Sequence, residues 1–280
     1  MRDEVFSFLA SLLRERAGLS LSRDKEYLLE SRLAPLARKR GHESVEALTQ
    51  ELRTGRDRQV EREIIEAMTT NESLFFRDAA AFTVFRDAVL PPLLQARTSS
   101  RKLRLWFAAC SSGQEPYSVA MLLEEERARL AAWDIELVAT DLSTEMIQRS
   151  QEGLYSHFEV QRGLPIQMLA KYFQKEERGW RIKEELKERV KFRAFNLLDD
   201  FGVLGFFDVI FCRNVLIYFD LPTKRNVLRR LGQSLARDGA LFLGGAETVI
   251  GVSDKFAPHP GHAGIFVPLA MPALGRAVGS

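Results

Sequence analysis

The sequence predicts an α/β protein in which an all-helical N-terminal domain precedes a doubly wound, mostly parallel β-sheet with a small antiparallel β-subdomain inserted in it. Three observations support this fold class. Residues 3–68 carry apolar positions at helical spacing and no strand pattern, and residues 103–245 alternate apolar strand patterns with helical ones. A hairpin pattern interrupts this alternation between about residues 154 and 190.

The N-terminal region is expected to consist of successive helices. The first helical pattern stops before Gly18 and the second stops before Gly41, as helices often do before a glycine. In the second helix, the apolar stripe is expected to contain Tyr27, Leu28, Leu33 and Leu36.

A basic stretch near the end of the second helix contains Arg32, Arg38, Lys39 and Arg40 without an intervening acid. One interpretation is a solvated helix face whose cations gain about 0.3–1 kcal/mol each from the nearby helix C-terminus. The other interpretation is a docking surface for an acidic partner. The sequence leaves both open.

A connector, residues 69–78, leads into a helix that Pro91 and Pro92 are expected to end. The α/β region then begins. Its expected strands are residues 103–109, 135–141, 190–195, 207–213 and 240–245, and its expected helices are residues 116–130, 143–151 and 223–236. Gly153 and Gly239 are expected to close two of these helices, and residues 264–270 are expected to return antiparallel beside the last strand.

The loop after the first strand has the composition of a cofactor site. Ser111, Ser112 and Gly113 let the backbone approach a ligand closely, and Glu115 follows at the start of the next helix. A loop for a pyrophosphate would not place an acid there, because the helix N-terminus attracts anions. The loop therefore favours a ligand with cationic and hydroxyl groups, such as S-adenosylmethionine.

Two polar residues follow later strands. Asp141 ends its strand, where a carboxylate can accept hydrogen bonds from ribose hydroxyls, although Asp141 or Ser143 can equally cap the next helix. Asn196 can pair with an adenine edge or simply occupy a turn.

The segment 207–220 is more specific, because a buried strand ends in Arg213 and Asn214 and is followed by Tyr218, whose hydroxyl requires a partner if it is buried. The connector contributes Asn71, Ser73 and Arg77. Composition alone favours Arg77 being exposed or paired with Asp78.

The composition excludes several function classes. The formal net charge is +2, so no global charge favours nucleic acid or an anionic membrane as partner. Four histidines are too scattered for a metal site, and Cys110 and Cys212 lie in or beside apolar strands as reduced thiols do. Without a signal-peptide pattern or an apolar run that spans a bilayer, a cytoplasmic protein is expected.

No Ser-His-Asp, Cys-His or metal-binding spacing is evident in the sequence. Methyl transfer from a sulfonium to a carboxylate needs no general base, because the carboxylate is already ionised near neutral pH. Positioning, desolvation and electrostatics then carry the catalysis.

Taken together, these segments resemble the CheR family, the glutamate O-methyltransferases of chemotaxis receptors. The motifs that carry the resemblance lie between Met68 and Glu247: TTNESLFFRD, FAACSSGQEPYSVAM, VATDLS, KYF, FNLL, FDVIFCRNVLIYFD and LFLGGAE. The resemblance implies a Rossmann-like class I methyltransferase domain over residues 91–280, an N-terminal domain over residues 1–68, and a connector and helix over residues 69–90 that complete the active site.

The resemblance also implies the site residues. S-adenosylmethionine, converted to S-adenosylhomocysteine, would contact Asn71, Ser73, Arg77, Glu115, Asp141, Asn196, Leu197, Asn214 and Val215. Arg77 and Tyr218 would flank the reacting methyl as catalytic residues. The implied partner is the helical cytoplasmic domain of a chemoreceptor, and the implied product is a glutamate methyl ester.

The sequence departs from the family pattern at two places, and neither removes a residue of the implied site. Ser73 stands where threonine is common, and Gly245-Ala246 stands where many members have His-Ser. The hairpin loop around Gly179 is shorter than in members that bind a pentapeptide at the receptor's C-terminus, so docking independent of such a pentapeptide is expected.

Three alternatives remain weaker on the sequence. A methyltransferase acting on RNA or a small molecule keeps the fold but not the connector and RNVLIYFD motifs. A non-catalytic cofactor sensor or scaffold has no need of Arg77 and Tyr218. A nicotinamide-dependent oxidoreductase is discouraged by the missing G-x-G-x-x-G.

Overall fold

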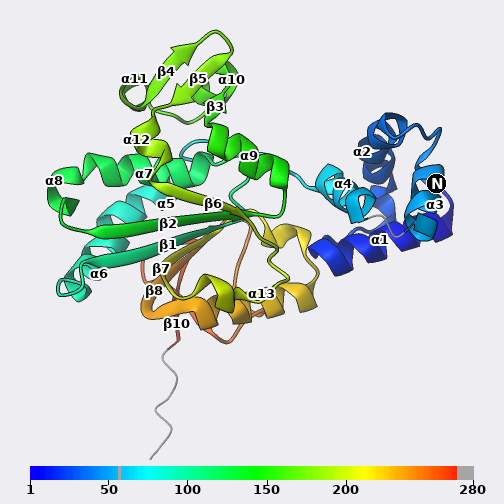
Figure 1. Ribbon diagram of the computed structural model, residues 1–280. Coiled ribbons are helices and arrows are strands. Elements are labelled where there is room, and N and C mark those ends of the chain that lie inside the picture. Colours follow the sequence, from blue (N-terminus) through cyan, green and yellow to red (C-terminus); the bar gives the residue numbers. More distant parts are fainter. Residues whose placement is uncertain (56–57, 270–280) are drawn as a thin grey trace, which may run out of the picture.

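A computed structural model describes residues 1–55 and 58–269 of the chain (Figure 1). The N-terminal domain is helical, as predicted. Its helices are α1 (Asp3–Ala17), α2 (Glu26–Lys39), α3 (Val45–Gly55) and α4 (Arg58–Met68), and the short 3₁₀ helix η1 (Arg23–Lys25) precedes α2.

The apolar stripe of α2 differs from the prediction. Leu29, Leu33 and Leu36 are buried, whereas Tyr27 is 65% exposed. Positions 29, 33 and 36 follow one face of a helix at i, i+4 and i+7, and Tyr27 lies off that face. Gly18 ends α1 in the left-handed conformation, with φ 74°, as expected.

The prediction that Pro91 and Pro92 end a helix is wrong. The helical run continues through α5 (Ala79–Val84), the π-helical turn η2 (Phe85–Val89) and α6 (Leu90–Ala96). Both prolines lie in the first turn of α6, where a missing N–H leaves no hydrogen bond unmade. The domain division expected at residue 90 thus falls inside a continuous helical run.

The central sheet is doubly wound and mostly parallel, as predicted. Its strand order is β6-β2-β1-β7-β8-β10-β9, so the order reverses between β1 and β7. The parallel strands are β1 (Lys102–Ala108), β2 (Asp134–Asp141), β6 (Val190–Ala194), β7 (Phe207–Cys212) and β8 (Leu235–Leu243). As expected, β10 (Ile265–Pro268) returns antiparallel to β8, and β9 (Phe256–Pro258) pairs with β10. Ala270 and the rest of the C-terminus lie outside the described residues.

Both faces of the sheet are covered, which explains why its strands are continuously apolar. Along β1, Leu105 and Phe107 face one core cluster and Trp106 faces the other. In Figure 1, α7 (Gln114–Glu125) and α9 (Thr144–Glu152) lie above the sheet and α13 (Leu221–Ser234) lies below it. The short helix α8 (Arg127–Leu130) follows α7, and the 3₁₀ turns η3 (Phe201–Leu204) and η4 (Leu216–Tyr218) flank β7.

Gly239 does not close a helix, so that expectation is wrong. The helix α13 ends at Ser234, and β8 begins at once with Leu235, so Gly239 lies inside the strand. A Cβ atom at Gly239 would lie 2.6 Å from the Asp208 carbonyl oxygen. The glycine therefore allows β8 to pass close to β7.

A small antiparallel sheet occupies the insertion and projects above α9 in Figure 1. Its order is β3-β5-β4, formed by Leu154–Tyr155, Gly179–Ile182 and Phe173–Glu176. The hairpin matches the prediction, whereas β3 was not expected. The flanking helices are α10 (His157–Gln161), α11 (Ile166–Tyr172) and α12 (Glu184–Lys187). Within the described residues, no helix is long and apolar enough to cross a membrane.

The two domains contact each other through the segment after α1. Leu19 forms an antiparallel bridge with Phe219, and the Ser20 N–H donates to the Tyr218 carbonyl at 2.9 Å. On the other side, Glu66 of α4 accepts hydrogen bonds from the Thr144 N–H and hydroxyl at 2.8 and 2.6 Å. The N-terminal domain is thereby held against the carboxyl edge of the parallel sheet.

Candidate functional site

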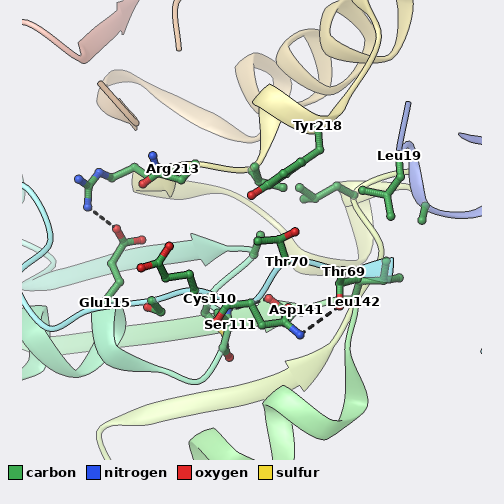
Figure 2. Close-up of a pocket in the computed structure, with 18 of the residues that line it drawn as sticks. Leu19, Thr69, Thr70, Cys110, Ser111, Glu115, Asp141, Leu142, Arg213 and Tyr218 are labelled. Carbon is green, nitrogen blue, oxygen red and sulfur yellow. Dashed lines mark hydrogen bonds and ion pairs between the residues drawn. The ribbon is translucent and has the colours of Figure 1, made fainter. Parts of the chain in front are cut away.

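A pocket lies beyond the carboxyl ends of the parallel strands, where the strand order reverses and ligands bind in such sheets (Figure 2). The N-terminal domain contributes Ala17 and Leu19 to its wall. The structure brings together in this pocket every residue expected at the site: Asn71, Ser73, Arg77, Glu115, Asp141, Asn196, Leu197, Asn214, Val215 and Tyr218.

The loop between β1 and α7 forms the floor of the pocket. Its backbone takes left-handed conformations at Ala109, Ser111 and Gly113, with φ values of 61°, 50° and 91°. Outside glycine such values are uncommon, and they cluster at functional sites. The loop is fixed from behind, because Ser150 donates to the Ser111 carbonyl at 3.0 Å and Tyr155 donates to the Ser112 carbonyl at 2.7 Å.

Arg213 compensates the charge of Glu115, a pairing that the sequence did not predict. Arg213 Nη1 donates to Glu115 Oε2 at 2.6 Å, and Nη2 donates to Asp78 Oδ2 at 2.6 Å and to the Arg77 carbonyl at 2.9 Å. Burial raises the pKa of Glu115, and Arg213 opposes that effect. Two carboxylates surround one guanidinium, so this end of the pocket retains a preference for cationic groups.

Arg213 itself is 6% exposed, and its Nε atom is buried without a hydrogen-bond partner among the described residues. This Nε atom has no exposed surface, so the Arg213 side chain acts on the pocket through Glu115 and Asp78 rather than by contacting a ligand through Nε. Its position at the end of a buried strand was the only sequence signal.

Of the two residues that the sequence offered as the cap of the helix after β2, Ser143 takes that role. The Ser143 hydroxyl caps α9 by accepting from the Met146 N–H. Asp141 instead accepts from the backbone N–H groups of Ser111 and Ser143 at 2.7 and 2.9 Å. Burial raises the pKa of Asp141, although these backbone donors oppose the rise. The carboxylate keeps free lone pairs at the pocket, which suits ribose hydroxyls.

Asn196 and Leu197 follow β6 at another side of the pocket. The Asn196 side-chain amide donates to the Arg16 carbonyl at 2.6 Å, and its oxygen accepts from the Leu198 N–H at 2.9 Å. One amide hydrogen of Asn196 remains for a ligand. Leu197 is 6% exposed and supplies an apolar surface beside it.

The connector carries Arg77 into the pocket between two buried aromatic residues and the start of α5. Phe75 and Phe76 anchor this segment in the core, and the Phe76 N–H donates to the Ser118 hydroxyl at 3.0 Å. Asp78 pairs with Arg213, so the alternative of an Arg77–Asp78 pair is wrong. Within the described chain, no carboxylate forms an ion pair with Arg77, whose Nη1 donates weakly to the Glu72 carbonyl at 3.3 Å.

Asn71 and Ser73 are the other connector residues expected at the pocket, and the loop after β1 contacts Asn71. Asn71 donates to the Thr69 hydroxyl at 3.1 Å, and its carbonyl accepts from the Ser111 hydroxyl at 2.8 Å. Ser73 is partly exposed on the pocket wall.

Tyr218, Asn214 and Val215 belong to the turn after β7, and Figure 2 shows the Tyr218 hydroxyl pointing into the pocket. Glu247, which the sequence analysis did not single out, fixes this turn. Its carboxylate accepts from the N–H groups of Asn214 at 2.8 Å, Gly244 at 2.7 Å and Ile217 at 3.3 Å. Asn214 has φ 60°, so the turn is held in a strained conformation.

The pocket therefore combines buried carboxylates for a cationic, hydroxyl-bearing ligand with a guanidinium and a phenol for a second, anionic group. Burial raises the pKa values of Cys110 and Cys212 well above the ordinary range, so neither thiol is an activated nucleophile. No group of three metal-ligating side chains occurs in residues 1–55 and 58–269.

This donor set fits S-adenosylmethionine. Asp141 offers acceptors for the ribose, and the Glu115 end of the pocket prefers the cationic amino group.

Comparisons with known proteins agree with this geometry. Residues 4–69 match the family model of the CheR methyltransferase all-alpha domain, and residues 71–265 match that of the CheR methyltransferase SAM-binding domain. Chemotaxis protein methyltransferase 1 of Pseudomonas aeruginosa is 42% identical over 255 residues, which cover 90% of this chain and 92% of that protein. Chemotaxis protein methyltransferase Cher2 of Pseudomonas putida is 40% identical over 248 residues, which cover 87% and 90%. This chain therefore belongs to the CheR family of chemotaxis methyltransferases and carries its S-adenosylmethionine-binding domain.

Proposed function

We propose that this protein transfers the methyl group of S-adenosylmethionine to glutamate side chains on the cytoplasmic helices of a chemoreceptor, forming methyl esters. The observation that carries the proposal is that Arg77 and Tyr218 line the same pocket and that Arg77 has no carboxylate partner among the described residues. A carboxylate substrate supplies the anion that the Arg77 guanidinium lacks.

Within the proposal, the cofactor supplies an electrophilic methyl group and the chain holds it in place. Asp141 binds the ribose hydroxyls, and Glu115 lies near the methionyl amino group. Asn196 and Leu197 surround the adenine. The remaining wall is formed by Asn71, Ser73, Asn214 and Val215, which come from the connector and the turn after β7. The connector and helix over residues 69–90 thus complete the site from outside the sheet.

The acceptor glutamate is already ionised at neutral pH, so the protein has no proton to remove. Arg77 orients the incoming carboxylate by charge-assisted hydrogen bonds, and Tyr218 fixes the other side of the reacting group. Transfer neutralises both carboxylate and sulfonium, so excessive stabilisation of the separated charges would slow the reaction. The half-buried position and weak protein contacts of Arg77 suit this requirement.

Two of the four cations in the basic stretch have partners within the protein. Arg32 donates to the Met68 and Thr69 carbonyls, and Arg40 pairs with Glu51 and Glu63. Arg38 and Lys39 are exposed, so the proposed contact with an acidic receptor helix falls to these two.

We also propose that docking does not depend on a receptor pentapeptide. The hairpin between β4 and β5 turns over only two residues, and a Cβ at Gly179 would lie 2.2 Å from the Tyr155 carbonyl oxygen. This turn is too short to provide a loop on which a peptide could bind. Titration with a receptor tail peptide should show no binding, and tight binding would refute this part.

Since the proposed substrate is a cytoplasmic domain, the proposed location of the protein is the cytoplasm.

The test incubates the protein with radiolabelled S-adenosylmethionine and a purified receptor cytoplasmic fragment, then measures base-labile methyl ester. Wild-type protein should label the fragment. Arg77→Ala should lower kcat by about 100-fold or more, because a charged donor to the reacting group is lost. Cofactor binding should weaken much less, because the other residues of the pocket wall are unchanged. Binding of cofactor without transfer to any receptor fragment would refute the proposal and favour a sensor or another substrate.

A further inference from the structure

We propose that the substrate helix docks on a surface at the edge of the pocket that both domains build. This surface, called the rim surface below, consists of Arg14 from α1, Ile217 from η4, and Leu221, Lys224 and Arg225 from α13. The inference rests on the proposed function and names where its substrate binds.

The two parts of the rim surface lie against each other. A Cβ atom at Gly18, directly after α1, would lie 2.9 Å from the Phe219 ring and 3.3 Å from the Thr223 side chain. Hydrogen bonds from Thr223 lower the pKa of Asp220, and the charges of Arg14 and Lys224 add to that effect. Cations from both domains therefore face the same carboxyl group, at the start of α13.

The rim surface also adjoins the reacting end of the pocket. Ile217 directly precedes Tyr218. Arg14 lies about one helical turn before Ala17, which lines the pocket together with Leu19. A helix lying on this surface can therefore direct a side chain into the pocket.

The cations of the rim surface are only partly compensated within the protein, since Arg14 and Lys224 act on Asp220 through their charge without pairing directly with it. Across the described residues, no ion pair involves Arg14, Lys224 or Arg225. Lys224 and Arg225 lie in the first two turns of α13, where the helix dipole favours acidic side chains rather than basic ones. The helix dipole therefore does not favour these two charges, and without direct ion pairs they remain available to an anionic partner.

Apolar side chains accompany these charges. Ile217 and Leu221 are 44% and 45% exposed. Leu221, Lys224 and Arg225 stand at i, i+3 and i+4 and so share one face of α13. A mixture of apolar and cationic groups complements an amphipathic helix that carries glutamates. Glutamates on neighbouring turns can pair with Lys224 and Arg225 while one glutamate reaches Arg77.

The test compares two arginine variants in steady-state methylation of a receptor cytoplasmic fragment. Arg225→Glu reverses a charge on the rim surface. Arg237→Glu is the matched control, because Arg237 is also exposed but lies near the start of β8, at the opposite edge of the sheet. Arg225→Glu should raise KM for the fragment about fivefold or more, with kcat and S-adenosylhomocysteine affinity unchanged. The difference should shrink at high salt, since exposed charges are screened.

Arg237→Glu should behave like wild type. Lys224→Gln serves as a second variant that removes a rim charge without setting another acid one turn from Asp220. Equal KM values for wild type, both rim variants and the control would overturn the rim surface while leaving glutamate methylation intact. A wild-type protein that transfers no methyl ester to the fragment would refute the proposed function, and the rim surface with it.

Discussion

Arg213, just after β7, joins two segments that lie far from it in the chain: the start of α7 through Glu115, and the end of the connector through the Arg77 carbonyl and Asp78. The guanidinium is nearly buried, and the Glu115 side chain is 14% exposed. Removing one partner of such a pair leaves an uncompensated buried charge, which is costly. Arg213 is therefore expected to matter for stability as well as for the geometry around Arg77.

Arg213→Met should lower the free energy of unfolding by about 3 kcal/mol or more, as measured by urea denaturation. Arg127→Met is the control, because Arg127 is 80% exposed and its pair with Glu124 contributes little. Equal losses in the two variants would contradict this account.

The same pair gives a pH dependence with a defined sign. Burial raises the folded-state pKa of Glu115, so the unfolded chain loses its proton first as pH rises. The contribution of this group to stability is therefore largest below the ordinary carboxyl pKa and falls as pH rises through the raised value.

Without Arg213 the pKa of Glu115 rises further, so Arg213→Met should lose more stability between about pH 5 and pH 7 than wild type does. Urea titrations at several pH values measure this; parallel pH curves would contradict it.

Glu247 fixes the turn that carries Asn214 and Tyr218, through three backbone N–H donors. Glu247→Gln retains one acceptor oxygen and places an amide against backbone donors. The free energy of unfolding should fall by about 1–3 kcal/mol, and kcat should fall because Tyr218 is less firmly held. Glu177→Gln, in the exposed hairpin turn, is the control. An unchanged stability and kcat for Glu247→Gln would show that the turn does not need this carboxylate.

The sequence indicated which residues line the pocket but not how they are held. Asp141 and Asn196 were identified from their positions after strands, because parallel strands bring such positions to one edge. The roles of Arg213 and Glu247 depend on partners 98 and 33 residues away, and local patterns carry no information about such pairs. For the same reason the sequence suggested an Arg77–Asp78 pair, whereas in the structure Asp78 pairs with Arg213, which is distant in the chain.

At the scale of elements, the basic stretch of α2 contains one cation that holds the connector and others that are exposed. Arg32 donates to the Met68 and Thr69 carbonyls at 2.7 and 3.0 Å and so holds the connector at the end of α4. Arg32→Ala should lower kcat for methyl transfer, because the connector positions Arg77. Arg38→Ala, on the exposed part of the same helix, should instead raise KM for the receptor fragment. Initial rates over a range of fragment concentrations separate the two; a pure KM effect of Arg32→Ala would contradict this division.

Strand and helix types were predictable from periodicity, whereas some element boundaries were not. Pro91 and Pro92 were read as helix breakers, but a π-helical turn precedes them and places both in the first turn of a new helix. Gly239 was read as a helix end, but it serves a close approach of β8 to β7. The two-residue strand β3 is too short to show a period and depends on its partner β5.

At the scale of the whole molecule, the N-terminal domain forms part of the pocket wall. Ala17 and Leu19 line the pocket, the Arg16 carbonyl accepts from Asn196, and Ser20 donates to the Tyr218 carbonyl. Cofactor binding should therefore depend on how the two domains meet. The sequence predicted both domains but not this contact, since Asn196 lies 180 residues from Arg16.

Two glycines in the N-terminal domain test this dependence. Gly18 and Gly41 both have left-handed φ values, 74° and 79°, so alanine at either site costs about 1–2 kcal/mol in backbone strain. A Cβ at Gly18 would lie 2.9 Å from the Phe219 ring, whereas a Cβ at Gly41 has nothing within 4 Å. Gly18→Ala should therefore weaken S-adenosylmethionine binding, measured by calorimetry, and Gly41→Ala should not. Equal affinities would show that the domain contact does not shape the cofactor site.

The central claim of this account is that the pocket between the domains transfers a methyl group to a glutamate carboxylate. Tandem mass spectrometry of a receptor cytoplasmic fragment after incubation with the protein and S-adenosylmethionine tests it most directly. We predict an added methyl group on glutamate side chains, removable by mild base and strongly reduced with Arg77→Ala. Methylation of any other side chain, or none on the receptor in the presence of bound cofactor, would contradict the claim.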